Sequence, residues 1–265
     1  MKTSDYMFGG GDDAPELTRL QNLEAAHDPL TFAMLRQAGI SPGKICADIG
    51  AGAGSVARYM AEQVGGEGRV DAVDLDQRFL GGLPDCARQV TLDITKDDLG
   101  EAVYDIIHAR FLLIHLHEAD RAVDAMWRAL KPGGALVLED ANFHAAYSAS
   151  PDPSISESVN NVGAAVLEMF RGRGLDPGFG LRIPSMLDAR GAESVVVETS
   201  APLVRGGTPM GVLSGESKHF LRKDLIATGL ASEEDVAVYH RATHDPLVWG
   251  MYHCTVSVLG LKPRI

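Results

Sequence analysis

The chain has 265 residues, 45% of them hydrophobic and 23% charged, which suits one large α/β domain or two modest ones. The formal net charge is −12 and no basic face is visible, so we expect no nucleic-acid partner. No apolar run is long enough for a membrane helix, and the first residues lack the apolar core of a signal peptide. The three cysteines are widely spaced and odd in number, so we expect no disulfide framework and a cytoplasmic location.

The N-terminal segment, residues 1–40, is expected to be largely helical. It begins with a polar, glycine-rich stretch that carries Tyr6. Residues 16–38 then predict one or two amphipathic helices, with a break at Asp28-Pro29.

The rest of the chain, residues 41–265, predicts a single domain of alternating strands and helices, which is typical of a parallel sheet covered on both faces. Strands are expected at 44–50, 68–76, 87–94, 104–113, 135–140, 192–200 and 249–260. Helices are expected at 55–64, 77–83, 118–130, 154–174, 183–191 and 233–243. The long segment at about 141–190, between the fifth and sixth strands, is the expected lid or substrate wall.

The stretch "CADIGAGAGS" places Gly50, Gly52 and Gly54 in the turn between the first strand and the next helix. A backbone without Cβ atoms can turn sharply there and let a ligand lie against it, beside the free N–H groups that begin the helix. Asp74 ends the second strand, where a carboxylate accepts hydrogen bonds from ribose hydroxyls. Both features fit a nicotinamide dinucleotide or S-adenosylmethionine. The spacing GxGxG differs from the dinucleotide pattern GxGxxG, and Asp48 precedes the first glycine by two positions.

"DIGAGAGS" resembles motif I of the class I S-adenosylmethionine-dependent methyltransferases, (D/E)xGxGxG. The resemblance continues through "VDAVDLD", "VTLDI", "YDIIHARFLLIHL" and "LKPGGALVLED", in family order, over residues 44–140. The N-terminal "DYMFGG" and "AAHDPLT" also look like small-molecule methyltransferases of bacterial secondary metabolism.

This resemblance implies a Rossmann-like, seven-stranded, mostly parallel sheet whose last strand is antiparallel, with an N-terminal helical cap and an inserted lid between strands five and six. It also implies S-adenosylmethionine as cofactor, with Asp93 on the adenine amino group, Gly54 and Ser55 facing the methionine part, and Ala109 and Arg110 bordering it. The full set of expected cofactor residues is Asp48, Gly50, Ala51, Gly52, Gly54, Ser55, Asp74, Leu75, Asp93, Ile94, Ala109, Arg110 and Arg19. Tyr6 and Arg19 are candidates to close over the cofactor.

A methyl transfer needs alignment and, for some acceptors, a base. His144 follows the fifth strand by four residues and is the leading candidate, with Tyr6 as a second catalytic candidate, whereas His115 is expected to help start the next helix. No metal is expected, because strand four ends in "HAR" and Ala141 separates the acid and amide that a catechol-type metal site would need as neighbours. An apolar or aromatic substrate site is expected from Met169, Phe170, Phe179, Met186, Trp249 and Tyr252.

The favoured function is methyl transfer to a medium-sized, natural-product-like small molecule at oxygen, nitrogen or carbon. The alternative is a non-methylating enzyme, such as a cyclase, on the same cofactor scaffold, because cofactor motifs can survive a change of chemistry. The glycine spacing speaks against a nicotinamide-dependent oxidoreductase, and a pure binding protein would not need both a cofactor site and a lid. The expected partner is a small molecule, with no nucleic acid and no membrane, and a homodimer is compatible with the sequence.

Overall fold

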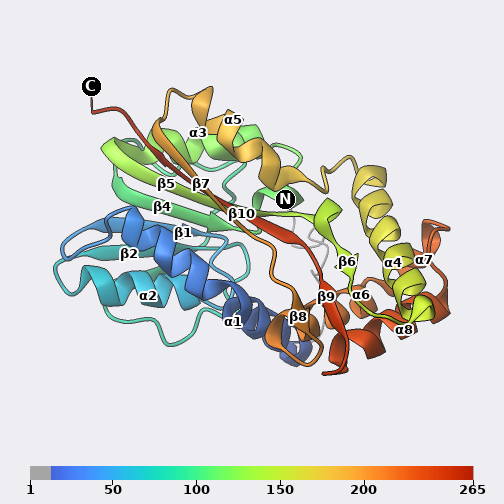
Figure 1. Cartoon of the computed structure of the whole chain (residues 1–265). Coiled ribbons are helices and arrows are strands. Elements are labelled where there is room, and N and C mark those ends of the chain that lie inside the picture. Colours follow the sequence, from blue (N-terminus) through green and yellow to red (C-terminus); the bar gives the residue numbers. More distant parts are fainter. Residues whose placement is uncertain (1–12, 265) are drawn as a thin grey trace.

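The computed structural model describes residues 13–264 and is built around one seven-stranded sheet (Figure 1). The strands of this sheet are β1 (Ile45–Ile49), β2 (Arg69–Val73), β3 (Ala87–Val90), β4 (Tyr104–Arg110), β5 (Leu130–Asn142), β7 (Glu193–Ser200) and β10 (Cys254–Leu261). Their order is β3-β2-β1-β4-β5-β10-β7, and β10 runs antiparallel to both of its neighbours. The expected sheet, mostly parallel with the last strand antiparallel, is therefore confirmed.

Helices cover both faces of the sheet because side chains alternate along each buried strand. Cys46 of β1 packs with α1 (Asp13–Gln37) and α2 (Ser55–Val64), whereas Ala47 and Ile49 face the core shared with α3 (Ala119–Ala129). β1, β2 and β4 are buried along almost their whole length, as expected for central strands covered on both faces, although each carries at least one charged residue.

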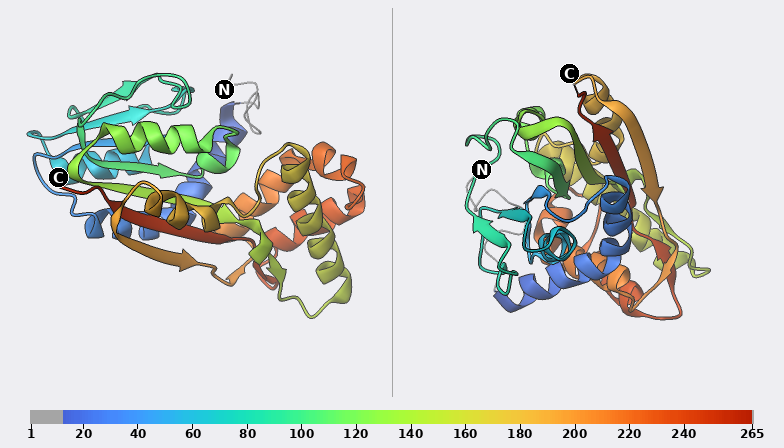
Figure 2. Two further views of the ribbon diagram at one scale, coloured as in Figure 1. Left: turned by 90° about the horizontal axis from the view of Figure 1, so that it is seen from above. Right: turned by 90° about the vertical axis from the view of Figure 1, so that its left-hand side faces the viewer.

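A cluster of four helices lies beyond one end of the sheet, and we call it the helical lid (Figure 2). The helical lid consists of α4 (Pro153–Gly172), α6 (Pro209–Phe220), α7 (Arg222–Ala227) and α8 (Glu233–His244). A small second sheet beside it has the order β6-β9-β8, formed by Tyr147–Ser148, Trp249–Met251 and Val204–Arg205. The expected insertion at 141–190 supplies α4 and also η4 (Phe179–Arg182) and α5 (Ile183–Asp188). The other helices of the lid come from the segment between β7 and β10, of which the sequence predicted one helix.

Three local predictions were wrong. The expected break at Asp28-Pro29 is absent: α1 continues through Pro29, because contacts from neighbouring elements hold the Asp28 carboxylate in place. Residues 77–83 form turns rather than a helix, with Gly82 at a φ of 70°. The expected strand at 249–260 is two strands, β9 and β10, interrupted where Tyr252 and His253 turn inward and are buried.

Across residues 13–264, none of the helices combines the length and the apolar character needed to cross a membrane.

Candidate functional site

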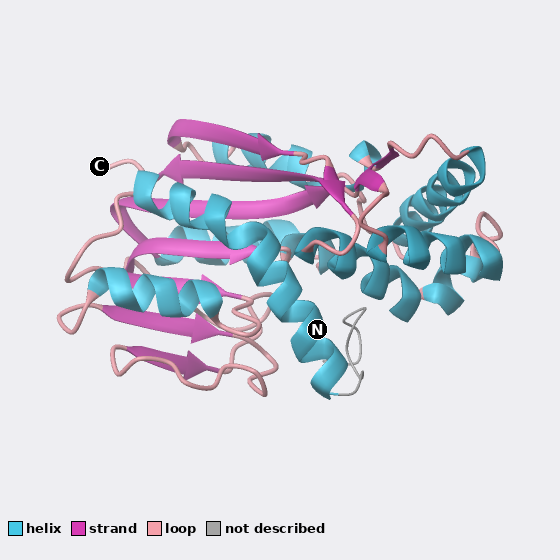
Figure 3. Ribbon diagram, turned by 60° about the horizontal axis from the view of Figure 1, so that its bottom comes forward, coloured by secondary structure: helices cyan, strands magenta, loops and turns pink. Residues whose placement is uncertain are grey.

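A cavity of about 220 Å³ lies beyond the carboxyl ends of β1, β2 and β4, where Figure 3 shows the arrowheads of these strands facing α1. In an open α/β sheet, this edge is where ligands bind. The lining comes from the glycine turn, the ends of the strands and the first turns of α1: Glu16, Arg19, Leu20, Leu23, Glu24, Asp48, Ile49, Gly50, Ala51, Gly52, Ala53, Ser55, Val56, Val73, Asp74, Leu75, Asp76, Arg78, Phe79, Leu92, Asp93, Ile94, His108, Arg110, Phe111, Leu112, His115 and Leu116.

The glycine turn forms the floor of this cavity and depends on left-handed backbone. Gly50, Gly52 and Gly54 have φ values of 75°, 57° and 88°. A Cβ atom on Gly54 would also lie 3.1 Å from both a guanidinium nitrogen of Arg58 and a methyl carbon of Leu80. Glycine meets both requirements, so the turn stays bare and a ligand can approach the backbone closely.

Asp74 stands beside this turn and is partly buried. The carboxylate accepts hydrogen bonds from the backbone N–H groups of Gly52 and Asp76, both at 2.9 Å. Burial raises the pKa of Asp74, and these two hydrogen bonds oppose the rise. A carboxylate has more acceptor positions than these two donors use, which fits additional hydroxyl donors such as those of a ribose.

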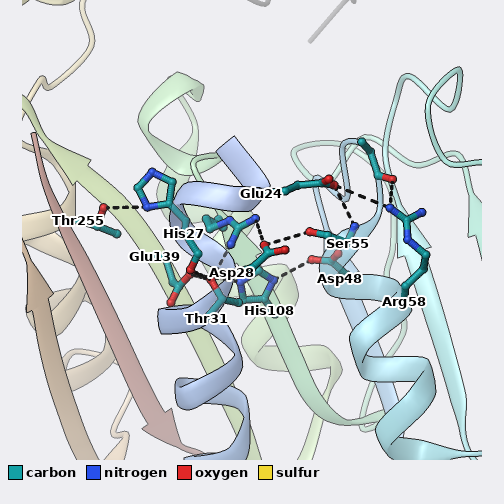
Figure 4. A network of polar contacts seen from close by, with 12 residues as sticks. Glu24, His27, Asp28, Thr31, Asp48, Ser55, Arg58, His108, Glu139 and Thr255 are labelled. Carbon is teal, nitrogen blue, oxygen red and sulfur yellow. Dashed lines mark hydrogen bonds and ion pairs between the residues drawn. The ribbon is translucent and has the colours of Figure 1, made fainter. Parts of the chain in front are cut away.

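The opposite end of the cavity gathers charges of both signs, contributed mostly by α1 (Figure 4). The backbone N–H of Ser55 donates to Glu24 at 3.0 Å, so the first turn of α2 is less open than the sequence suggested. Asp28 accepts from the Ser55 hydroxyl at 3.0 Å and from Arg110 at 2.9 Å. Arg19 pairs with Glu16 at 2.8 Å.

These donors and acceptors fit S-adenosylmethionine. A zwitterionic amino-acid group needs carboxylates for its ammonium and guanidinium groups for its carboxylate, and one end of the cavity offers both. The other end offers the Asp74 carboxylate. Burial raises the pKa of Glu24, and its contacts with the Ser55 backbone N–H and with Arg58, 4.0 Å away, oppose the rise.

A buried ionic network underlies this end of the cavity (Figure 4). His108 of β4 lies with its Nδ1 atom 2.7 Å from Asp48 and its Nε2 atom 3.7 Å from Glu139. Thr31 donates a hydrogen bond to Glu139 and accepts one from Arg110 at 2.7 Å, which ties α1 to the sheet. All three ionic side chains are almost fully buried, so each depends on the others for compensation of its charge.

Most of the residues expected at the cofactor line this cavity, namely Asp48, Gly50, Ala51, Gly52, Ser55, Asp74, Leu75, Asp93, Ile94, Arg110 and Arg19. Gly54 and Ala109 support it from behind without lining it. Tyr6 lies outside the described residues.

Sequence reasoning missed several residues of the lining, notably Glu24, His108, Phe111 and His115. His108 could have been found from strand register, because it sits opposite Asp48 where β4 pairs with β1. His115 does not start a helix as expected. It ends the short 3-10 helix η2 (Leu113–His115), and burial lowers its pKa to about 3.

A second cavity, of about 90 Å³, adjoins the first and shares Arg19, Leu23, Phe111 and His115 with it. Its remaining lining is mostly apolar and comes from α1, the helical lid and the ends of β5 and β10: His27, Ile114, Ala141, Phe143, Val166, Met169, Phe170, Met210, Leu213, Ser214, Ser217, Lys218, Leu221 and His253. Of the residues expected at a substrate site, Met169 and Phe170 lie here.

Several polar side chains are buried at this second cavity, among them His27, Lys218 and His253. His27 and His253 each leave the Nε2 atom without a hydrogen-bond partner, and burial lowers the pKa of both below its ordinary value. Lys218 is 8% exposed, donates to the Ser214 hydroxyl at 3.1 Å and lies 5.5 Å from the ring centre of Phe143. Burial lowers its pKa to about 8, and within residues 13–264 it forms no ion pair.

His144, the expected base, is exposed and lines neither cavity. Its Nδ1 atom lies 3.1 Å from the side-chain oxygen of Asn142, and its Nε2 atom accepts from Arg171 at 3.3 Å. Asp140, four residues earlier, is fully enclosed, and burial raises its pKa to about 7.

Comparison with known proteins gives a family for the central part of the chain. Residues 47–138 match the family model described as "Methyltransferase domain". The ubiquinone/menaquinone biosynthesis C-methyltransferase UbiE of Vibrio campbellii is 26% identical over 141 residues, which are 46% of this chain and 54% of that protein. Methyltransferase str3 of Strobilurus tenacellus is 24% identical over 208 residues, which are 77% of this chain and 73% of that protein. This chain therefore spans about half the length of the UbiE relatives it matches.

Two solved structures share the fold. One is phosphoethanolamine N-methyltransferase 2 of Haemonchus contortus in complex with S-adenosyl-L-methionine, with a TM-score of 0.53 and 18% identity, covering 98% of this chain and 56% of that chain. The other is the cyclase SpnF, with a TM-score of 0.52 and 17% identity, covering 89% of this chain and 80% of that chain. At these identities the likeness shows the fold alone.

Proposed function

We propose that this chain, a class I S-adenosylmethionine-dependent methyltransferase by its matched domain and its fold, methylates a small, largely apolar molecule that carries an acidic oxygen. The observation that supports this most directly is the pair of adjoining cavities. The larger one has the donors and acceptors that fit the cofactor, and the smaller one is lined mostly by apolar side chains, with buried polar groups that include His27, Lys218 and His253.

The cofactor, when bound, supplies a methyl group whose bond to a sulfonium sulfur breaks as its bond to the acceptor forms. The chain's own contribution is to hold the two molecules in line, which removes most of the entropic part of the barrier. Phe111 and His115 border both cavities and would face the reacting atoms. The helical lid would exclude water from this junction.

Lys218 supports an acidic acceptor. A lysine ammonium that is buried without a carboxylate partner is unfavourable unless a ligand supplies the negative charge. The Nζ atom lies beside the Ser214 hydroxyl, so a carboxylate or phenolate of the acceptor would be bound there by both side chains. A polymer such as a nucleic acid is too large to be the acceptor in a cavity of about 90 Å³.

For an acceptor that enters as a neutral phenol or carboxylic acid, we propose that His27 or His253 receives the proton, in place of the exposed His144. Each is at least nine-tenths buried at the second cavity and has a ring nitrogen without a partner. Burial and then the charge of Lys218 lower the pKa of His253 to about 3, so a bound anion on Lys218 would make His253 more basic.

The test is incubation of the purified chain with isotope-labelled S-adenosylmethionine and a panel of small phenols and carboxylic acids, read by mass spectrometry. We expect a labelled product that is heavier than its acceptor by one methyl group. Transfer of label to RNA or protein alone would refute the small-molecule assignment. An unlabelled product with the mass of its substrate would favour the cyclase alternative.

The chemical class of the acceptor is tested with the variant Lys218→Met. The matched control is Lys223→Met, which changes a nearby exposed lysine. For an acidic acceptor, we expect Lys218→Met to raise KM by about 10-fold or more with kcat less affected, because a charge-assisted hydrogen bond is removed. A neutral analogue of the same acceptor should respond little. Equal effects on both acceptors would rule out the acidic-oxygen assignment while leaving methyl transfer in place.

A further inference from the structure

Three side chains of the kinds that bind metal ions meet where α6 packs against α8, outside both cavities. Glu216 of α6 places its Oε1 atom 3.0 Å from Nε2 of His240 and 3.2 Å from Nε2 of His244, both on α8. The potential ligand atoms of all three lie within 4.8 Å of one another, and each side chain is partly exposed. The two histidines are four residues apart, so one face of α8 presents both imidazoles.

The hydrogen bonds of His244 define which of its ring nitrogens carries a proton. Its Nδ1 atom lies 2.7 Å from the backbone carbonyl of His240, and a carbonyl oxygen accepts only, so Nδ1 is the donor. In the neutral ring, Nε2 therefore has a lone pair. That lone pair faces a carboxylate oxygen at 3.2 Å, which is repulsive unless a proton or a metal ion lies between the two atoms.

The spacing of these atoms is close to that around a tetrahedral zinc ion. Nitrogen and oxygen ligands about 2.0–2.2 Å from such an ion are about 3.3–3.5 Å from one another. The observed separations of 3.0 and 3.2 Å need only a small outward shift of partly exposed side chains. The hydrogen bond from Nδ1 of His244 to the His240 carbonyl also matches the usual arrangement of a metal-binding imidazole. In that arrangement, the nitrogen that does not bind the metal donates to a backbone oxygen.

The backbone of α6 is shaped to admit the His244 ring. A Cβ atom at Gly215 would lie 2.1 Å from the Thr243 hydroxyl and 2.9 Å from Cε1 of His244. Thr243 in turn donates to the His240 carbonyl at 2.9 Å. The close approach at Gly215 therefore holds the imidazole of His244 against the residue that precedes Glu216.

We propose that Glu216, His240 and His244 bind one divalent transition-metal ion, Zn²⁺ being the best match, that joins α6 to α8. Two imidazoles and one carboxylate are the donors that Zn²⁺ favours over Mg²⁺ or Ca²⁺. The fourth coordination position would be taken by water or by His219, whose ring centre lies 5.0 Å from that of His240. This site is distinct from the proposed methyl-transfer site and departs from the expectation of no metal, which considered the strand ends.

The consequence is mechanical. Glu216 immediately precedes Ser217 and Lys218, which line the second cavity, so the metal would fix the α6 wall of that cavity. None of the three ligands lines either cavity, so the ion would not contact the reacting groups.

The test uses the full chain without a histidine tag, freed of metal by a chelator, and titrated with Zn²⁺ in a calorimeter. We expect one equivalent of Zn²⁺ to bind, Mg²⁺ to give no heat, and Co²⁺ to give the visible absorption of a tetrahedral site. Two variants remove ligands: the double variant His240→Gln/His244→Gln, and the single variant Glu216→Gln. The control is His117→Gln, which changes an exposed histidine away from the site.

Loss of a direct ligand should weaken Zn²⁺ binding at least about 10-fold, with the control unchanged. Zn²⁺ should also raise the melting temperature of the parent but not of the double variant. Circular dichroism checks that each variant folds, and Glu216→Gln carries the test if the double variant does not. Equal Zn²⁺ affinity in the parent and the variants would overturn the assignment. Absence of Zn²⁺ binding by the parent would also overturn it, and would mean that a proton joins His244 to Glu216 instead.

Discussion

The buried network of Asp48, His108 and Glu139 gives a measurable prediction for His108→Gln. The imidazole of His108 lies between the two carboxylates, with its Nδ1 atom 2.7 Å from Asp48 and its Nε2 atom 3.7 Å from Glu139. Glutamine can replace a hydrogen bond, but it carries no positive charge. The variant would therefore leave two carboxylates in the core with Arg110 as the nearest remaining cation, through Thr31.

The expected magnitude follows from the burial. Removing one partner of a buried ion pair costs about 3–5 kcal/mol, because the remaining charge is not compensated. In a chain of this size each kcal/mol corresponds to about 2–4 °C, so we expect the melting temperature of His108→Gln to fall by about 6–20 °C. Exposed His117→Gln is the matched control and should change the melting temperature by less than about 2 °C.

The pH dependence separates a charge effect from a packing effect. Burial by itself would lower the pKa of His108, but Asp48 and then Glu139 raise it above the ordinary value of 6.5. A histidine whose pKa is raised by folding stabilises the protein fully below its unfolded pKa, and this contribution is lost as pH rises through the folded pKa. The deficit of His108→Gln should therefore be largest near pH 6 and shrink above neutral pH.

Thermal unfolding followed by circular dichroism at pH 6, 7.5 and 9 measures both effects. A melting temperature for His108→Gln within 2 °C of the parent at pH 6, or a deficit of equal size at all three pH values, would refute the proposed ionic role.

Three further predictions concern the cofactor cavity and the strand end beside it. Asp74→Ala should weaken S-adenosylmethionine binding by about 10–100-fold in calorimetry, because charged hydrogen bonds contribute about 1.5–3 kcal/mol, and Asp74→Asn should lose less; unchanged affinity in Asp74→Ala would exclude the ribose role. Gly54→Ala should destabilise the fold by about 1–2 kcal/mol in urea unfolding, because its φ of 88° is strained for any residue with a Cβ; no loss would mean that the turn can relax. Asp140→Asn should gain stability relative to the parent by up to about 4 kcal/mol between pH 4 and pH 8, because burial raises the Asp140 pKa from 3.8 to about 7 and its neutral form is favoured in the fold; parallel pH profiles for the two proteins would contradict this.

The sequence was most informative where function depends on the backbone. Gly50, Gly52 and Gly54 are required by positive φ values that other residues reach only with strain, so the turn could be recognised in the letters alone. Asp74 was found for a related reason: it stands at the carboxyl edge of the sheet, where ligands bind. Asp93, which lines the same cavity, was expected only from the family resemblance.

The second cavity could not be found in the same way. His27, Lys218 and His253 come from α1, α6 and the segment before β10, and no local pattern relates positions so far apart. His144 was a natural choice by its distance from a strand end, but the side chain is exposed, since the chain turns into η3 (Phe143–Ala145). The direction of a side chain after a strand depends on that turn, which sequence spacing does not fix.

The sequence by itself determined the order of the seven main strands along the chain and the bare turn under the cofactor, because hydrophobic periodicity and glycine act over a few neighbouring residues. The antiparallel last strand was implied only by the family resemblance. The tertiary structure decided which side chains meet. It joined His108 to Asp48 through strand register, brought His27 and Lys218 to one apolar wall, and paired Glu216 with His240 and His244 across two helices. Such meetings depend on how whole elements pack, and packing is set by the entire buried core rather than by the residues that react or bind.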